Sequence, residues 1–278
     1  MPTTSLRERS RKKFYTSSIL RGGEIAGAGA VVRRTRLYRV FSVVIRQRDL
    51  GEADRILSLY TRERGKLSAV AKGIKRPRSK LAGSLQSFSY AVVQLAAGRS
   101  LEVVTQARAI DGHYRLREDM NRYAHASYVA ELLDALTDEG MGDEETFDLL
   151  LSTLVALNQG EDSATVVRAF ELKLLGGLGY GPEMESCAVC GGDVDANPLF
   201  SVGQGGIVCQ QCGTGGGINI SGAGLRALRN LRRMKMDDLL GRRLSEGVQR
   251  EVGCVMRAFV DSHLDRPLRS AAFLTDEG

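Results

Sequence analysis

The sequence predicts an α+β protein with a small β-barrel on its N-terminal side, a mainly helical domain after it, and an inserted module that carries four cysteines. Three observations predict this order. Short runs that alternate apolar and polar residues fill residues 37–108, the apolar period becomes helical after about residue 116, and two C-x-x-C pairs lie within residues 187–212. With 278 residues, the chain has room for two or three small domains.

Five short strands are expected in the first of these regions. The runs are β-branched or alternate apolar with polar residues, and turns at Asp49–Gly51 and Glu63–Gly65 separate the first three. The expected strands are residues 40–45, 56–60, 67–71, 88–95 and 101–105. Five short strands in about 70 residues are typical of a closed barrel of the OB type, which binds single-stranded nucleic acids and other partners on one face.

Helical periodicity follows, with apolar residues spaced three and four apart. Asp143 and Ser163 are expected to cap the N-termini of two helices, and the glycine-rich stretch 176–181 to end the second of them. This stretch closes a helix rather than opening one, so it is not predicted to bind phosphate. The expected helix faces are Val129, Leu132, Leu133, Leu136; Phe147, Leu150, Leu151, Leu154; Val166, Val167, Phe170, Leu174; Leu225, Leu228, Leu231; and Val252, Val255, Met256, Phe259.

The four cysteines predict a zinc site. Cys187 and Cys190 form one C-x-x-C pair and Cys209 and Cys212 another, with eighteen residues between the pairs. A glycine follows each second cysteine, which lets the backbone turn with positive φ around a metal. Four thiolates close the coordination shell of Zn²⁺, so the metal is expected to be structural. Two disulfides or a redox dithiol are the alternatives, and the fifth cysteine, Cys254, is expected to be a small buried apolar residue.

Charge is distributed unevenly along the chain. Residues 1–115 hold 24 Lys and Arg against 8 Asp and Glu, whereas residues 116–278 hold 15 against 25. The basic half is expected to face a polyanion, and a solvated basic face without a ligand is the alternative. The candidate phosphate-binding residues are Arg46, Arg48, Arg55, Arg64, Lys66, Lys72, Lys75, Arg76, Arg78 and Lys80, and the candidate base-stacking residues are Tyr38, Tyr60 and Tyr90.

Several classes of protein are not favoured. The chain has no G-x-x-x-x-G-K-[ST] motif of an ATPase, and the basic half has no acidic cluster of the kind a metal-dependent nuclease needs. His113, His125 and His263 are far apart in sequence and are expected at the surface or in packing. No run approaches 18 apolar residues, and thiolate zinc ligands suit a reducing compartment. We therefore expect a cytoplasmic protein that is not an enzyme and does not bind membranes.

The expected organisation has five parts. Residues 1–36 are rich in Arg, Ser and Gly and are expected to form a flexible basic extension. An organelle transit peptide or an artefact of the assumed translation start are the alternatives for this stretch. The other parts are an OB-fold domain over 37–115, a helical domain over 116–184, a Cys₄ zinc module over 185–216, and C-terminal helices over 217–278 that pack on the helical domain.

Several blocks of the sequence resemble, in the same order, those of the RecO family of bacterial recombination mediators. The resemblance spans about residues 37–274, and the 36-residue extension before it is the departure from the family's pattern. The blocks are GEADRILSLYTRERGKLSAVAKGIKRPRSKL (51–81), RYAHASYVAELLDAL (122–136), ETFDLLLSTLVAL (145–157), RAFELKLLGGLGYGPEMESCAVCG (168–191) and RPLRSAAFL (266–274).

The resemblance implies a DNA-repair protein that binds single- and double-stranded DNA and anneals complementary strands. It also implies that RecR and single-stranded DNA-binding protein are partners in loading RecA, at the nucleoid. The acidic tail of the single-stranded DNA-binding protein is expected on the helical domain, where we hypothesise Arg122, Arg168 and Lys173 as anchors. The alternative function is a zinc-ribbon and OB scaffold that binds RNA in transcription or translation.

Overall fold

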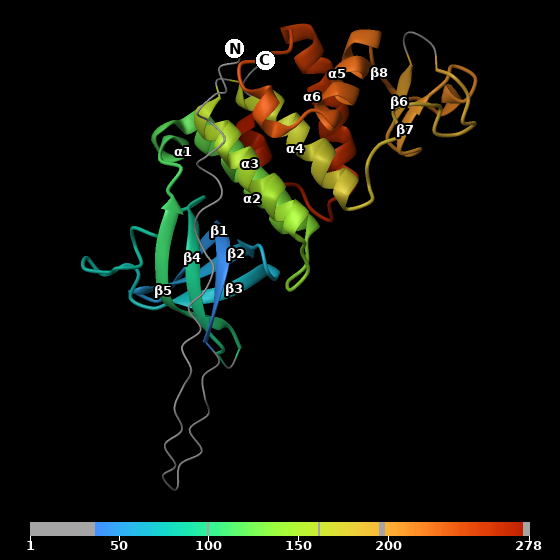
Figure 1. Cartoon of the computed structure of the whole chain (residues 1–278). Coiled ribbons are helices and arrows are strands. Elements are labelled where there is room, and N and C mark those ends of the chain that lie inside the picture. Colours follow the sequence, from blue (N-terminus) through green and yellow to red (C-terminus); the bar gives the residue numbers. More distant parts are fainter. Residues whose placement is uncertain (1–36, 99, 161, 195–197, 275–278) are drawn as a thin grey trace, which may run out of the picture. The chain divides into compact units, whose positions relative to one another are not determined.

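The computed structural model describes residues 37–98, 100–160, 162–194 and 198–274 (Figure 1). The predicted basic extension, residues 1–36, lies outside the described residues. Within the described ranges, no helix has the length and apolar character needed to cross a membrane.

The N-terminal part is a closed five-stranded barrel (Figure 1). Its strands are β1 (Leu37–Leu50), β2 (Asp54–Thr61), β3 (Gly65–Ala71), β4 (Tyr90–Ala96) and β5 (Glu102–Asp111). Their order around the barrel is β1-β2-β3-β5-β4, and the parallel pair β3 and β5 closes it. All five predicted strands are present, which confirms the OB-like prediction.

The boundaries of all five strands differ from the predicted ones, and most of all those of β1, which runs from Leu37 to Leu50 instead of over residues 40–45. β4 begins at Tyr90 because Phe88, which the sequence pattern places in the strand, has a φ of 66° and turns the chain before the strand starts. β5 continues to Asp111, well past the predicted end, and pairs with the whole of β4. Residues that alternate along the strands fill the barrel, among them Val40, Val44, Leu57, Leu59, Leu67, Ala69, Val93 and Leu95.

Helices dominate the chain after the barrel (Figure 1). Asp119 caps the N-terminus of α2, and Asp143, as predicted, caps that of α3. The predicted cap Ser163 is wrong, because the carboxylate of Asp162 accepts the Thr165 N–H and Ser163 is the first helical residue. The helices are α1 (Arg115–Glu118), α2 (Met120–Leu136), α3 (Glu144–Gln159), α4 (Ser163–Gly177), α5 (Gly222–Arg233) and α6 (Glu246–Asp261), with 3₁₀ turns η1 (Gly213–Gly215), η2 (Met236–Leu239) and η3 (Ser270–Leu274).

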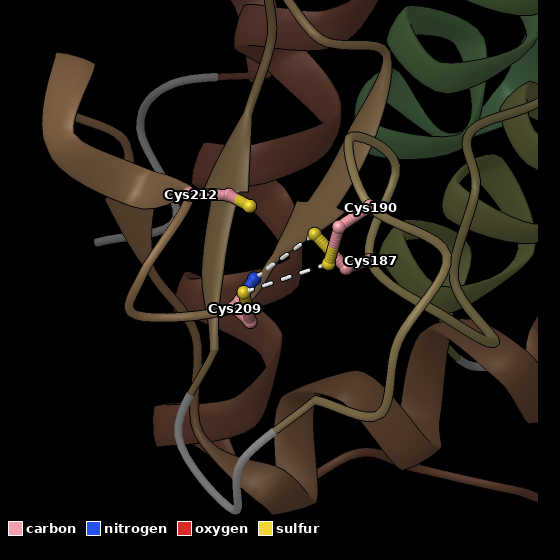
Figure 2. Close-up of side chains that lie close together, drawn as sticks. All are labelled: Cys187, Cys190, Cys209 and Cys212. Atoms are coloured by element: carbon pink, nitrogen blue, oxygen red, sulfur yellow. Dashed lines mark hydrogen bonds between the residues drawn. The ribbon is translucent and has the colours of Figure 1, made fainter.

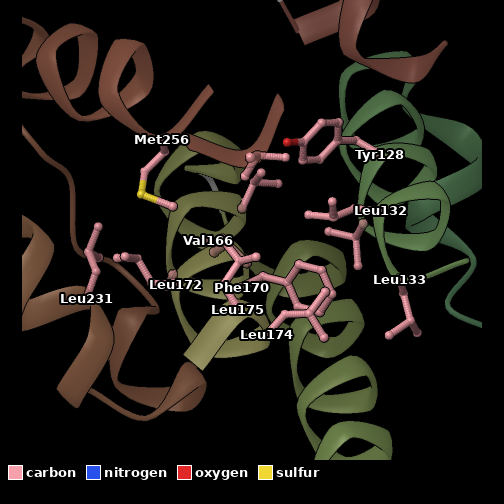
Figure 3. Packing of buried hydrophobic residues seen from close by; sticks show 14 of the residues in the cluster. Tyr128, Leu132, Leu133, Val166, Phe170, Leu172, Leu174, Leu175, Leu231 and Met256 are labelled. Carbon is pink, nitrogen blue, oxygen red and sulfur yellow. The ribbon is translucent and has the colours of Figure 1, made fainter. Parts of the chain in front are cut away.

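Helix α4 lies at the centre of the helical core. Figure 3 shows its side chains between those of α2 on one side and those of α5 and α6 on the other. The labelled core residues are Tyr128, Leu132, Leu133, Val166, Phe170, Leu172, Leu174, Leu175, Leu231 and Met256, all of them buried. This packing confirms the predicted apolar faces of all five long helices, although Leu136 and Leu151 are only partly buried.

A buried polar group lies within this apolar core. The Glu171 carboxylate is fully buried, and it accepts hydrogen bonds from Arg168 at 2.7 Å and from the Tyr128 hydroxyl at 2.5 Å. Burial raises the pKa of Glu171, and it raises the pKa of Tyr128 well above its ordinary value. The three side chains satisfy one another inside the core.

Polar contacts join the barrel to the helices. The Lys66 ammonium and the Arg46 guanidinium both contact the Asp134 carboxylate of α2, at 3.3 and 3.5 Å. Directly after β2, Arg62 pairs with Asp148 of α3 at 2.8 Å. The backbone approaches closely at Gly65, where a Cβ atom would lie 2.1 Å from the Met141 carbonyl oxygen.

Residues 199–219 add a small sheet that the sequence patterns do not predict. Its strands are β6 (Leu199–Ser201), β7 (Gly206–Val208) and β8 (Ile218–Asn219), in the order β7-β6-β8. Cys254 of α6 is exposed, so the expectation that it is buried is wrong. The buried positions of that helix are Val252, Val255, Met256, Phe259 and Val260, and Cys254 lies on the opposite face.

Candidate metal centre and nucleic-acid interface

The four cysteines converge on one point (Figure 2). Their sulfur atoms all lie within 4.8 Å of one another, and the sulfurs of Cys190 and Cys209 are 3.9 Å apart. A Zn–S distance of about 2.3 Å in a tetrahedron places the sulfurs about 3.8 Å apart, so the cluster has the size that zinc requires. The cysteines are free thiols, not disulfides. This group can hold a metal ion.

Each C-x-x-C pair is held by its own backbone turn. The Gly191 N–H donates to the Cys187 carbonyl, and the φ of Gly191 is 69°, as the sequence predicts. The same prediction is wrong for Gly213, which begins the turn η1 instead. A Cβ atom at Gly213 would lie 2.7 Å from the end of the Leu199 side chain, which would have to move to make room for it.

The backbone also favours thiolate at the cluster. Hydrogen bonds from the main chain at Cys190 and Cys209 lower the pKa of Cys187 to about 6. The Cys209 N–H lies 3.4 Å from the Cys187 sulfur. The pKa of Cys212 is raised to about 12, first by its hydrogen bonds with the sulfurs of Cys209 and Cys190. Shared protons of this kind are what a divalent cation displaces when it binds cysteines.

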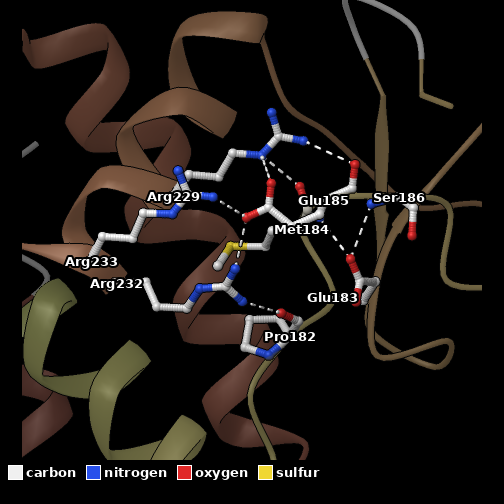
Figure 4. A network of polar contacts seen from close by, with 8 residues as sticks. All are labelled: Pro182, Glu183, Met184, Glu185, Ser186, Arg229, Arg232 and Arg233. Atoms are coloured by element: carbon white, nitrogen blue, oxygen red, sulfur yellow. Dashed lines mark hydrogen bonds and ion pairs between the residues drawn. The ribbon is translucent and has the colours of Figure 1, made fainter.

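The cysteine cluster is attached to the helical core through Glu185 (Figure 4). Three arginines of α5 contact its carboxylate: Arg232 at 2.9 Å, Arg233 at 2.8 Å and Arg229 at 3.5 Å. The neighbouring Glu183 accepts the N–H groups of Glu185 and Ser186, which lowers the pKa of Glu183. The chain that leads to Cys187 is thereby fixed to α5.

The ten predicted phosphate-binding residues fall into two groups. Five have an acidic partner: Arg46 and Lys66 contact Asp134, Arg55 and Lys75 contact Asp49, and Arg64 lies 3.9 Å from Glu102. The Lys66 side chain is only 13 % exposed, so it is a link to α2 with little surface for a ligand. The other five are exposed and form no ion pair within the described part of the chain: Arg48, Lys72, Arg76, Arg78 and Lys80.

Four of these free cations lie on one loop, residues 72–80, which we call the basic loop. Its base is fixed to the β1–β2 turn, because the Lys75 N–H donates to the Ala53 carbonyl and the Lys75 ammonium lies 3.0 Å from Asp49. The Gly73 N–H donates to the Asp54 carboxylate at 2.7 Å. The loop therefore presents positive charge on a short, anchored segment.

The three candidate stacking tyrosines are less accessible. Tyr60 is fully buried, so the prediction that it stacks on bases is wrong, and burial raises its pKa to about 12. Tyr90 packs between Phe41 and Phe147, with ring centroids 6.2 and 6.0 Å away. The guanidinium of Arg64 covers the Tyr38 ring at 4.4 Å. Tyr38 and Tyr90 are partly buried.

An exposed strip on the outer face of the barrel is absent from the predicted site. Arg39 and Phe41 of β1 are exposed, and Phe41 is paired through Val92 of β4 with Arg108 of β5. A signal for this strip is present in the sequence, because Arg39 and Phe41 alternate with the inward-facing Val40 and Ser42.

The three hypothesised tail anchors already have partners within the chain. The Arg122 guanidinium donates to the Leu157 carbonyl at 2.7 Å, and the Lys173 ammonium donates to the Arg232 carbonyl at 2.7 Å. Arg168 is buried against Glu171. The histidines are also in packing positions: His113 and His125 are buried, and one ring nitrogen of each lies 2.8 Å from a main-chain carbonyl.

Comparisons with known proteins agree with the resemblance of the sequence blocks. The family described as "Recombination protein O N terminal" matches residues 36–113, and "Recombination protein O C terminal" matches residues 117–272. The chain is 37 % identical over 249 residues to a protein named "DNA repair protein RecO" from Roseiflexus sp., with 87 % of each chain covered. Proteins of the same name from Pelotomaculum thermopropionicum and Symbiobacterium thermophilum are also 37 % identical, over 86 % of this chain and 94 % and 96 % of theirs.

The fold and the site define an OB-like barrel joined to a helical core, with a four-cysteine cluster. The chain belongs to the RecO family of DNA-repair proteins.

Proposed function

We propose that this protein is a non-enzymatic recombination mediator that binds single- and double-stranded DNA and anneals complementary strands. The observation that carries the proposal is the basic loop, where Lys72, Arg76, Arg78 and Lys80 are exposed and free of acidic partners among the described residues. The membership in a family of DNA-repair proteins supports DNA as the polyanion. The proposed function needs no chemical step, because phosphate binding and base pairing suffice for annealing.

The basic loop is suited to a reversible and sequence-independent grip on DNA. Each Lys or Arg that contacts a phosphate releases condensed counterions, and this release favours binding regardless of base sequence. The ion pair between Lys75 and Asp49 and the fixed φ of Pro77 stiffen the loop, so less conformational entropy is lost when DNA binds. Arg48 of β1 and the partly paired Arg46, Arg55 and Arg64 extend the proposed interface along the barrel.

We also propose that the cysteine cluster holds a structural Zn²⁺. The size of the cluster and its four sulfur donors support this metal. Four thiolates leave no open position for a substrate, so the ion would stabilise the fold of the proposed module, residues 185–216, and would take no part in chemistry. The link from Glu185 to α5 would carry that stability to the helices.

The proposed partners are RecR and single-stranded DNA-binding protein, which act together with this protein to load RecA at the nucleoid. The acidic tail of the single-stranded DNA-binding protein is proposed to dock on the helical domain. Arg122 and Lys173 are partly exposed, although Arg122 also lies 3.8 Å from the Asp119 carboxylate. Arg168 is the weakest of the three proposed anchors, because its guanidinium is buried and bound to Glu171.

The proposed domain limits follow the sequence: an extension over 1–36, the barrel over 37–115, helices over 116–184, the zinc module over 185–216, and helices over 217–278. An RNA-binding scaffold is the competing function. A basic loop alone does not separate the two, because DNA and RNA both present phosphates.

The proposal is tested by strand annealing. Complementary DNA strands are coated with single-stranded DNA-binding protein, and annealing is followed by fluorescence transfer with and without this protein. The proposed function predicts faster annealing of coated DNA and no such effect on RNA strands of equal sequence. Annealing that is no faster than the spontaneous reaction, or tighter binding of the RNA strand in a parallel titration, would contradict it.

A further inference from the structure

A cleft of about 880 Å³ lies where the barrel meets the helices. One wall is formed by the second half of β1 and by residues 86–88, and the other by α2 and η3. The cleft is thus built from segments that are more than 200 residues apart in the sequence, since Arg46 and Phe273 both line it. Its volume is in the range of sites that enclose small organic groups.

Large apolar side chains surround this cleft and remain in contact with solvent. Met120 is 90 % exposed, Phe273 is 70 % exposed and Tyr123 is 45 % exposed. The Tyr123 ring is held edge-on against Phe88, with centroids 5.4 Å apart. Exposed apolar side chains gathered around a cleft indicate a binding surface, because isolated folding gives no reason to leave them in water.

The acidic residues of the cleft all have hydrogen-bond or ion-pair partners. Asp49 is paired with Arg55 and Lys75, and Asp134 with Arg46 and Lys66. The third, Glu131, accepts the backbone N–H groups of Arg269 and Ser270 at 3.1 and 2.8 Å. Each carboxylate in the cleft therefore has at least two hydrogen-bond or ion-pair donors, and the cationic Arg269 side chain beside Glu131 remains exposed.

The cleft adjoins the basic loop. Asp49 lines the cleft and also binds Lys75 of the loop at 3.0 Å, so the two features share this residue. Arg48, which is exposed, precedes Asp49 in β1. A chain of phosphates lying on the basic loop and Arg48 would carry its bases to the edge of the cleft.

We propose that this cleft receives unpaired bases of a single strand, which stack on Tyr123 and Phe273 while the neighbouring phosphates lie on Arg48 and the basic loop. The inference rests on the proposed DNA binding and deepens it. Bases in a duplex are stacked and paired, so they cannot enter the cleft, whereas those of a single strand can. The cleft would give the protein a preference for single strands that phosphate contacts alone do not supply.

The test compares an oligo(dT) strand with an abasic strand of the same length and charge. The intact protein should bind oligo(dT) about tenfold more tightly than the abasic strand, since stacking adds to affinity for each base held. Tyr123→Ala and Phe273→Ala should each reduce this advantage, and Tyr123→Phe, which keeps the ring, should retain it. The salt dependence of binding should stay unchanged in all three variants, because they retain every phosphate-binding side chain.

A direct readout is also available, because the chain has no tryptophan. In Phe273→Trp, the emission of the single indole should be quenched by oligo(dT) and unaffected by the abasic strand. Equal affinity of the intact protein for the two strands, or an unreduced advantage in both alanine variants, would overturn the inference. The inference would also be overturned if the alanine variants lost binding of an apolar, acidic peptide but still bound oligo(dT). That result would make the cleft a protein-docking surface. If neither strand binds the intact protein, the proposed DNA binding itself has failed.

Discussion

Lys66 of β3 and Asp134 of α2 hold the barrel against the helical core. The Lys66 ammonium lies 3.3 Å from the Asp134 carboxylate and donates to the main-chain carbonyl of the same residue at 2.6 Å. Arg46 contacts the carboxylate from the side of β1. Because the Lys66 side chain is almost covered, its charge depends on this one residue for a partner.

Replacing Asp134 by Ala is expected to destabilise the protein. The Lys66 ammonium would stay partly buried without its carboxylate, which should lower the free energy of unfolding by about 1–3 kcal/mol. Urea unfolding followed by circular dichroism measures this change. The control is Asp138→Ala, an exposed acid in the loop after α2, which should change stability by less than about 0.5 kcal/mol. Equal stability of the two variants would show that the link contributes nothing.

Removing only the acid of the buried pair Arg168 and Glu171 is expected to lower stability far more than replacing both residues. Glu171→Ala should cost about 3–5 kcal/mol, because it leaves the arginine charge buried and unpaired. The double replacement of Arg168 and Glu171 by Met should recover most of this loss, since it removes both charges and keeps the volume. A double variant that is less stable than Glu171→Ala would contradict this account.

Glu131 predicts how the C-terminal turn η3 responds to pH. Burial raises the pKa of Glu131, but hydrogen bonds from the side chain and backbone of Ser270 outweigh burial, so the pKa lies below its ordinary value. A carboxyl whose pKa is lower in the folded than in the unfolded chain stabilises the fold at pH values above its unfolded pKa of about 4.3. This stabilisation is lost as the pH falls through the folded pKa. The protection factors of residues 269–274 against hydrogen exchange should therefore fall in acid.

Glu131→Gln is the matched variant for that experiment. In this variant the protection factors of η3 should be lower at neutral pH and should show no further fall in acid, because the titrating group is gone. An unchanged acid response in Glu131→Gln would assign the effect to another group.

The cysteine cluster predicts a metal-dependent fold. Replacing Cys187 or Cys209 by Ser should release zinc and destabilise the proposed module by several kcal/mol, on the order of the binding free energy of a structural site. Metal content and thermal melting with and without chelator measure this. Cys254→Ser is the control, because that cysteine is exposed and outside the cluster. Purified protein without zinc, or melting that chelation leaves unchanged, would contradict the assignment.

Local patterns predict much of the fold. Alternation and β-branching locate the five barrel strands, and the helical period locates the buried faces of α2 to α6. The errors in the predicted fold occur where a local pattern fits two positions equally well or where an element is too short to show a pattern. Asp162 and Ser163 are both good capping residues, and only the position of the first helical turn decides between them. Strands of two or three residues, such as β6 and β8, are too short to give an alternating pattern.

Long-range pairing explains the errors in the candidate site. The charge of Lys66 is evident from the sequence, but its contact with Asp134, which is 68 residues away, is not. Tyr60 looks like other strand tyrosines until the helices cover it. The cleft could not be found from the sequence, because Phe273 and Arg46 meet only in the folded chain. The basic loop could be predicted without knowledge of long-range contacts, because its charges lie close together in sequence.

The central claim is that the basic loop binds phosphates, and the salt dependence of DNA affinity tests it most directly. The affinity for one single strand is measured over a series of salt concentrations for the intact protein, for Arg76→Ala/Arg78→Ala, and for Arg250→Ala/Arg266→Ala. The last variant removes the same charge from exposed positions outside the barrel. The account predicts that the loop variant binds this strand more weakly and that its slope of log affinity against log salt falls by about one unit for each phosphate that is no longer bound. The control should keep the parent slope. A loop variant with the slope of the intact protein would contradict it.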